Sequence, residues 1–148
     1  MTARIFVDTN VLVYTRDAST LEKQVQAAEW MSYLWRVGNG RLSMQVVTEY
    51  YSVVTKKLKP GMDSIRARED VEDLLAWQPL PLTTDLVLDA WQVQDLFQLS
   101  WWDSLIVSAA RMQKCSYLLS DDFQHAQDFQ GVRVINPFML KPSELEPG

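Results

Sequence analysis

Cysteine and histidine are almost absent from this 148-residue chain, which contains one of each. Cys115 cannot form an internal disulfide, so no disulfide partner is expected, and its apolar neighbours indicate a buried residue. A zinc site of imidazole and thiolate ligands is excluded, and a catalytic triad has only one candidate base, His125. We expect His125 on the surface of a short helix. Chemistry in this protein must therefore come from carboxylates.

Long apolar runs are lacking as well. No segment reaches the roughly 18 to 20 apolar residues that a membrane span needs, and the N-terminus lacks a basic stretch followed by a long apolar run. We therefore expect a soluble, cytoplasmic protein with no membrane partner. The composition, 47% hydrophobic and 22% charged, is that of a globular domain. The length predicts one domain over residues 1–140, followed by a flexible tail at 141–148.

Positive charge is scarce and unevenly distributed. The net charge of −5 argues against a simple basic surface for nucleic acid. Residues 36–68 nevertheless carry seven basic and two acidic residues, whereas residues 69–103 carry eight acids and no Lys or Arg. Two solvated helical faces would explain this pattern. Contact of the basic segment with phosphates, or with an acidic partner, is the alternative.

Short apolar segments alternate with helical patterns along the chain. The pattern predicts strands at residues 4–7, 117–119 and 132–135, a short edge strand or link at 79–82, and a short polar helix before the last strand. It predicts longer helices at about 20–37, 44–58, 63–77, 84–97 and 101–112. Ser43 and Thr84 are the expected caps of the second and fourth of these helices. Such alternation is typical of an α/β domain with a largely parallel sheet and helices on both faces.

Acidic residues occupy four positions that such a fold can bring together. They are Asp8 after the first strand, Glu49 on a helix, Asp103 in a first turn, and Asp121 with Asp122 after a later strand. Functional groups gather at the carboxyl ends of parallel strands, so both strand-terminal clusters should open onto one edge. Converging carboxylates stay ionised mainly beside a divalent cation, and an all-oxygen ligand set selects Mg²⁺ or Mn²⁺.

Each acid also has a local explanation. Asp8 can be a turn or cap residue, and Asp103 can interact favourably with the dipole of its helix. Glu49 lies near a second apolar row of its helix, which predicts a half-buried side chain or one that faces a cleft. The metal-site hypothesis therefore depends on the acids jointly and not on any one of them.

Five segments of the chain carry a family resemblance: FVDTNVL, VVTEYYSVV, LSWWDSLIVSAA, YLLSDDFQ and VINPF. In this order and spacing they resemble the PIN domain, and specifically its short bacterial branch, the VapC-like toxins of toxin–antitoxin pairs. The resemblance implies a three-layer α/β/α fold with a central, mostly parallel sheet of about 4–5 short strands. It further implies an endoribonuclease that depends on one or two Mg²⁺ or Mn²⁺ ions, a small antitoxin partner and a homodimer.

The resemblance also implies roles for individual residues. The catalytic, metal-binding acids would be Asp8, Glu49, Asp103 and Asp122. Thr9, Asn10 and Ser120 match positions that orient these carboxylates by hydrogen bonds. Asp121 is an additional acid, which either binds a metal through water or points outward, the interpretation that we favour. The candidate RNA contacts in the basic segment are Arg41, Lys56, Lys57 and Lys59.

The adjacent residues Trp101 and Trp102 have two interpretations. They can stack on unpaired RNA bases, but tryptophans at a helix start usually pack, and we expect packing here.

Two other functions compete with the ribonuclease. Phosphatases of the haloacid dehalogenase kind also place an Asp after their first strand, but they need a second Asp two residues later, where this chain has Asn10. A catalytically silent PIN-like scaffold that binds RNA or protein is the other alternative. Acids at all four matched positions argue against the silent scaffold.

Overall fold

A five-stranded sheet with the strand order β2-β1-β3-β5-β4 forms the middle layer of the computed structural model, which describes residues 2–145. Its strands are β1 (Ile5–Val7), β2 (Gly40–Arg41), β3 (Tyr117–Leu119), β4 (Asp128–Phe129) and β5 (Val132–Ile135). All neighbouring strands pair in parallel except β4 and β5. Val7, Leu119 and Ile135 lie in register at the ends of β1, β3 and β5. The residues that follow these strands therefore emerge at one edge.

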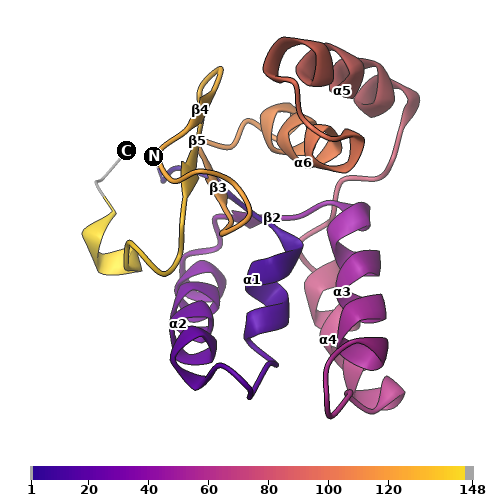
Figure 1. Ribbon diagram of the computed structural model, residues 1–148, viewed down its shortest axis with the longest axis vertical. Coiled ribbons are helices and arrows are strands. Elements are labelled where there is room, and N and C mark those ends of the chain that lie inside the picture. The colour runs from indigo at the N-terminus through magenta and orange to yellow at the C-terminus, as the bar shows by residue number, and fades with distance from the viewer. Residues whose placement is uncertain (1, 146–148) are drawn as a thin grey trace.

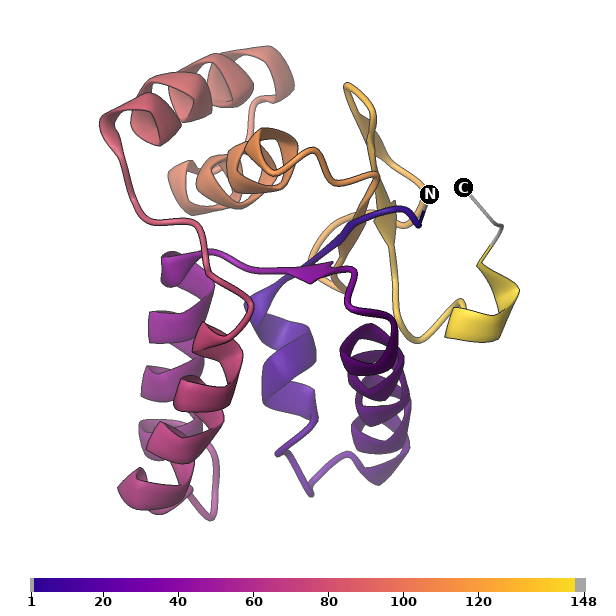
Figure 2. The ribbon, with the colours of Figure 1, turned by 180° about the vertical axis from the view of Figure 1, so that it is seen from behind.

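Helices cover both faces of this sheet. On one side lie α1 (Thr9–Tyr14), α2 (Leu21–Val37), α3 (Met44–Lys56) and α4 (Ser64–Leu75), and on the other lie α5 (Thr84–Phe97) and α6 (Trp101–Met112) (Figure 1). Figure 2 shows the same layers from behind, with the turn that joins α2 to β2 in view. The three-layer α/β/α architecture with a mostly parallel sheet confirms the predicted fold class. No helix within residues 2–145 combines the length and the apolar character that a membrane crossing requires.

The core lies between the sheet and its two helical layers. Ile5, Phe6 and Val7 are fully buried, as expected for a central parallel strand that is covered on both faces. Cys115 is buried too, in agreement with the sequence-based prediction. The indole N–H of Trp30, on α2, donates to the backbone carbonyls of Pro137 (3.2 Å) and Leu140 (3.0 Å). These bonds fix the segment after β5 against α2.

The chain continues beyond this point into a short 3₁₀-helix, Pro142–Glu144. Residues 146–148, the last part of the tail predicted at 141–148, lie outside the described residues. The boundaries of the domain and of its tail stay predictions.

Several short elements escaped the sequence-based prediction, among them α1, β2 and the two-residue strand β4. Helix α1 spans only six residues, and β2 only two, so neither is long enough to show a hydrophobic period. Thr83 and not Thr84 caps α5, because its hydroxyl accepts the Leu86 N–H at 3.2 Å. Residues 79–82 form a link with an isolated parallel bridge between Leu80 and Ser43.

The short polar helix expected before β5 is a wrong prediction. Residues 121–127 form bends and turns because Phe123 is buried, and because the backbone of Ala126 and Gln127 bonds with that of Val134. His125 is accordingly not on a helix. It is half-buried, and its Nδ1 accepts the backbone N–H of Asn136 at 3.0 Å.

Candidate active site

Asp8 lies directly after β1, and only 6% of its surface is exposed. One carboxylate oxygen accepts the Thr9 N–H at 2.8 Å, which makes Asp8 the N-cap of α1. The other oxygen accepts the Ser120 hydroxyl at 2.8 Å and the Asn10 amide at 3.2 Å. Asp8 is thus a helix cap, as its local interpretation proposed, and also the most buried of the four acids.

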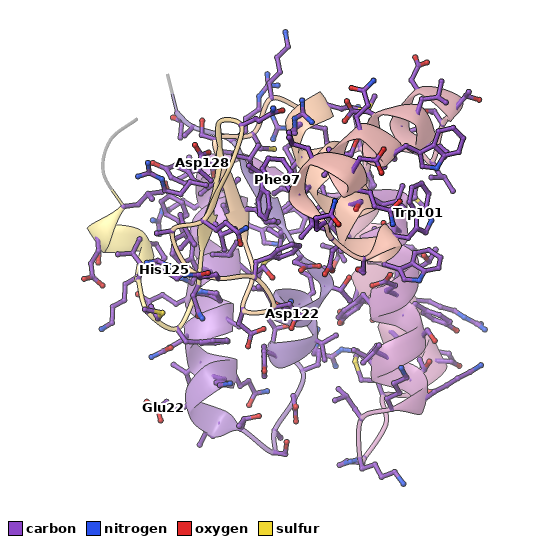
Figure 3. All side chains as sticks on the ribbon, turned by 45° about the horizontal axis from the view of Figure 1, so that its top comes forward. Glu22, Phe97, Trp101, Asp122, His125 and Asp128 are labelled. Atoms are coloured by element: carbon purple, nitrogen blue, oxygen red, sulfur yellow. The ribbon has the colours of Figure 1, made fainter. Side chains whose placement is uncertain are left out.

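Asn10 connects the first strand end with the loop after β3. Its amide nitrogen lies 2.9 Å from a carboxylate oxygen of Asp122 and 3.2 Å from the Ser120 hydroxyl. The Ser120 hydroxyl in turn accepts the backbone N–H of Asp122 at 3.1 Å. Figure 3 shows Asp122 beside the N-terminal end of α1. These bonds fix the loop after β3 relative to Asp8.

Glu49 reaches the same edge from the middle of α3, where it is half-buried as predicted. One of its oxygens accepts the Thr9 hydroxyl at 3.0 Å, and the other accepts the Gln45 amide at 3.1 Å. The Gln45 amide also lies 3.4 Å from the backbone carbonyl of Trp102 on α6. Gln45 was not foreseen from the sequence. Its only indication there is its position one helical turn before Glu49.

Asp103 lies in the first turn of α6 and is half-buried. Its backbone N–H donates to the Ser100 hydroxyl, the N-cap of this helix, at 3.1 Å. Burial raises the pKa of the Asp103 carboxyl, and hydrogen bonding to Ser100 opposes the rise. The negative charges of Asp122 and Glu49 raise it further. Asp103 therefore interacts electrostatically with acids from two other elements.

The pKa of Asp8 shows the same coupling. Burial raises it from 3.8 to about 7, against the lowering effect of hydrogen bonds from Ser120 and Thr9. The charges of Asp122 and Asp103 add to the rise. Within residues 2–145, none of the four acids pairs with a Lys, Arg or His side chain. Like-charge interactions therefore link Asp103 to Asp8, Asp122 and Glu49, with no paired basic side chain to offset them.

Asp121 belongs to a different set of contacts. Its carboxylate lies 3.9 Å from the Lys23 ammonium group of α2. Burial raises its pKa, while the Tyr14 hydroxyl and Lys23 lower it. Asp121 therefore has its own compensating cation, unlike Asp8 and Asp122.

The predicted RNA contacts do not lie beside these acids. Arg41 lines a cavity together with Arg4, which precedes β1, whereas Asp8 follows β1. Lys56, Lys57 and Lys59 are exposed at the far end of α3, with Lys56 seven residues beyond Glu49, or about two helical turns. The structure brings the acids together and leaves the basic residues at other places.

The two tryptophans at the start of α6 differ from each other. Trp101 is half-buried and packs against the core, as predicted. The prediction of packing is wrong for Trp102, which is 63% exposed. The helix start turns only one of the two adjacent side chains inward, so the indole of Trp102 is left on the surface next to Asp103.

The donor chemistry at this edge fits a hard divalent cation. All four side chains are carboxylates, and the pKa of Asp8 is raised first by burial and further by the charges of Asp122 and Asp103, which a bound cation would offset. Within residues 2–145, however, no group of three or more His, Cys, Asp or Glu side chains is spaced to hold a metal ion. The residues fit the ion by chemistry and by charge.

Comparisons with known proteins identify the family. Among solved structures, FitAB bound to an IR36 DNA fragment matches with a TM-score of 0.70 and 21% identity over 93% of this chain and 97% of that chain. At this identity the likeness shows the fold alone. No curated protein matches the chain. The model of the PIN domain matches residues 5–128, most of the 148 residues. The chain therefore belongs to the PIN domain family.

Proposed function

We propose that this chain is a divalent-metal-dependent endoribonuclease and the toxin of a type II toxin–antitoxin pair in the cytoplasm. PIN domains are generally nucleases, and PIN nucleases generally use divalent metal ions. The observation that carries the proposal is the gathering of Asp8, Glu49, Asp103 and Asp122 at one edge of the sheet, where the charge of Asp103 interacts with those of the other three. Like-charged carboxylates at one place lower the stability of a fold, and binding of Mg²⁺ or Mn²⁺ between them would offset this loss.

The four acids would bind one or two metal ions, and the polar residues around them would orient the carboxylates by hydrogen bonds. When bound, the metal supplies activation of a water molecule and stabilisation of charge on the leaving oxygen of the phosphodiester. Thr9 fixes Asp8 through its N–H and Glu49 through its hydroxyl, and Ser120 fixes Asp8 from the opposite strand. Gln45 adds a second bond to Glu49. This set of donors orients the carboxylates before substrate arrives.

Asn10 also helps to separate this proposal from a phosphatase of the haloacid dehalogenase kind. Such an enzyme needs an acid two residues after the strand-terminal Asp. Here the amide of Asn10 donates towards Asp8 and Asp122, and an acid at that position would add to the repulsion. The contacts of Asn10 favour a role in orienting the acids.

RNA would approach across the exposed indole of Trp102, which is available to stack on an unpaired base beside Asp103. Lys56, Lys57 and Lys59 are proposed as contacts for phosphates farther along the strand. FitAB, which shares the fold, is bound to a DNA fragment in its structure, so a nucleic-acid-bound assembly with an antitoxin is part of this proposal. A homodimer belongs to it as well.

Purified protein with Mn²⁺ is expected to cleave single-stranded RNA, with loss of cleavage when the metal is chelated. Asp8→Asn should reduce the rate by at least about 10³-fold, because the most buried carboxylate of the site is removed. Asp95→Asn, an exposed acid on α5, is the matched control and should keep full activity. Circular dichroism of each variant checks that the fold is retained.

Intact RNA after incubation with wild-type protein and Mn²⁺ would instead support the silent scaffold. Growth arrest on expression, relieved by a small protein encoded next to this gene, is the expected result for a toxin. RNA cleavage without growth arrest would support the nuclease activity and contradict the toxin assignment.

A further inference from the structure

The cavity lined by Arg4 and Arg41 lies at the amino edge of the sheet, at the opposite end of β1 from the acids. It has a volume of about 600 Å³, and its principal lining residues are Arg4, Trp35, Arg41, Trp77 and Gln113. We call it the arginine–tryptophan cavity. None of its lining residues belongs to the acidic site. The turn between α2 and β2, which contributes Gly38 and Gly40, is seen in Figure 2.

Two guanidinium groups converge on this cavity. Arg4 donates through one terminal nitrogen to the backbone carbonyl of Gln113 at 2.9 Å. Arg41 donates through one terminal nitrogen to the carbonyls of Gly40 at 2.8 Å and Gly38 at 3.4 Å. Among residues 2–145, the remaining nitrogens of both groups have no acceptor, and neither group has a carboxylate partner. Each arginine is therefore anchored on one side and keeps donors for an anion.

The guanidinium charges of Arg4 and Arg41 both act on the thiol of Cys115. Burial raises the pKa of the Cys115 thiol to about 12, and the charges of Arg41 and Arg4 both oppose this rise. Cys115 lies three residues after the last residue of α6 and two residues after Gln113. Two positive charges that line one cavity favour an anionic ligand there.

Two indole rings form the aromatic side of the cavity. The ring centroids of Trp35 and Trp77 are 5.1 Å apart, with an interplanar angle of 56°. Trp77 is held close against Gly40, where an added Cβ would lie 2.4 Å from its ring. Trp35 is 45% exposed, so much of its surface is accessible. The cavity thus combines the fixed indole ring of Trp77, the accessible indole ring of Trp35 and two guanidinium groups.

We propose that the arginine–tryptophan cavity binds a nucleotide, with its phosphate at Arg4 and Arg41 and its base against Trp35. Guanidinium groups bind phosphate through paired N–H donors, and indole rings stack on any base. A free nucleoside monophosphate and one residue of an RNA strand share this chemistry. The proposal does not depend on the acidic site or on catalysis there.

The test follows the indole N–H signals of the full chain by two-dimensional NMR during titration with AMP. The Trp35 signal should shift with AMP, and adenosine or inorganic phosphate alone should bind at least about tenfold more weakly, because each lacks half of the contacts. Arg41→Gln should weaken AMP binding about tenfold through the lost charge-assisted bonds. Arg36→Gln, which removes an exposed arginine of α2 outside the cavity, is the matched control and should bind as the wild type does.

Trp35→Leu provides a second variant that does not depend on the arginines, and Trp91→Leu, on α5, is its control. If an oligoribonucleotide shifts the Trp35 signal and binds with higher affinity than AMP, the cavity is assigned to RNA. If AMP binds with higher affinity, the cavity is assigned to a free nucleotide. The proposal is overturned if neither ligand shifts Trp35 or Trp77. It is also overturned if inorganic phosphate binds as tightly as AMP, or if Arg41→Gln and Arg36→Gln weaken binding equally.

Discussion

The carboxylate of Asp8 is both the N-cap of α1 and the most buried acid of the site. A cap needs only an acceptor for the Thr9 N–H, and an uncharged asparagine would provide one. The charge itself is costly at this position, since burial raises the pKa of Asp8 from 3.8 to about 7. The cost of the charge is what separates a functional Asp8 from a purely structural one.

Asp8→Asn is expected to stabilise the metal-free protein above neutral pH. In the unfolded chain Asp8 ionises near pH 3.8, but in the fold it stays protonated up to about pH 7. The stability of the wild type should therefore fall as the pH rises between these values and level off above pH 7. The variant lacks this loss, so its advantage should be small near pH 4 and on the order of 4 kcal/mol at pH 8.

Urea denaturation at a series of pH values with a chelator present measures this advantage. Asp95→Asn, at an exposed position, should show no pH-dependent gain. An Asp8→Asn variant that is less stable than the wild type at pH 8 would mean that the carboxylate contributes to folding and is not a strained functional group.

Among the secondary-structure elements, long ones could be predicted from the sequence and short ones could not. Strands β3 and β5 and helices α3 and α6 appear where apolar runs and caps placed them. The two-residue strand β2 and six-residue helix α1 lack a period, and the loop at 121–127 is shaped by the burial of Phe123. Tertiary contacts decided these segments.

The site shows the same division between local and tertiary information. Asp8 and Ser120 could be placed together from the sequence, because both follow buried parallel strands and so reach one edge. The partnership of Gln45 with Glu49 and Trp102 could not, since it depends on how α3 packs against the start of α6. Exposure of Trp102 likewise depends on this packing.

One partly buried network joins the helices on the α3 side of the sheet. Asp70, on α4, accepts two bonds from Arg16 at 2.7 and 2.9 Å and one from the Tyr50 hydroxyl of α3 at 2.6 Å. Arg16 follows α1, so this network ties three helices together next to Glu49. Removal of this network should lower the stability of the fold more than it changes the chemistry of the site.

Asp70→Ala is expected to lower the free energy of unfolding by about 3 kcal/mol, because it leaves Arg16 and Tyr50 partly buried without an acceptor. Asp73→Ala, an exposed acid on the same helix, should change stability by less than about 0.5 kcal/mol. Chemical denaturation gives both values. Equal effects of the two substitutions would show that the network contributes nothing specific.

The molecule as a whole separates its charges by function. The uncompensated acids lie at the carboxyl edge of the sheet, and the two arginines of the arginine–tryptophan cavity lie at the amino edge. The central strand β1 between them is only three residues long. A negative net charge is therefore compatible with the proposed action on nucleic acid, because four of the acids that contribute to it belong to the proposed metal site.

Trp102→Ala is expected to raise the KM for single-stranded RNA about tenfold while changing kcat little, since a stacked base contributes about 1–3 kcal/mol to binding. Trp91→Ala, at an exposed position on α5, serves as the control and should leave KM unchanged. Steady-state kinetics with a short unpaired substrate separates the two constants. A matching fall of kcat in Trp102→Ala at constant KM would argue that the indole supports Asp103 and does not bind a base.

The central claim is that Asp8, Glu49, Asp103 and Asp122 together hold a divalent cation. An anomalous-difference map from crystals grown with Mn²⁺ tests it most directly, with Asp8→Asn crystals as the comparison. The account predicts a manganese peak in coordination distance of the Asp8 carboxylate and near the other three acids, and its loss in the variant. Manganese bound elsewhere, or a peak that persists unchanged in Asp8→Asn, would contradict the account.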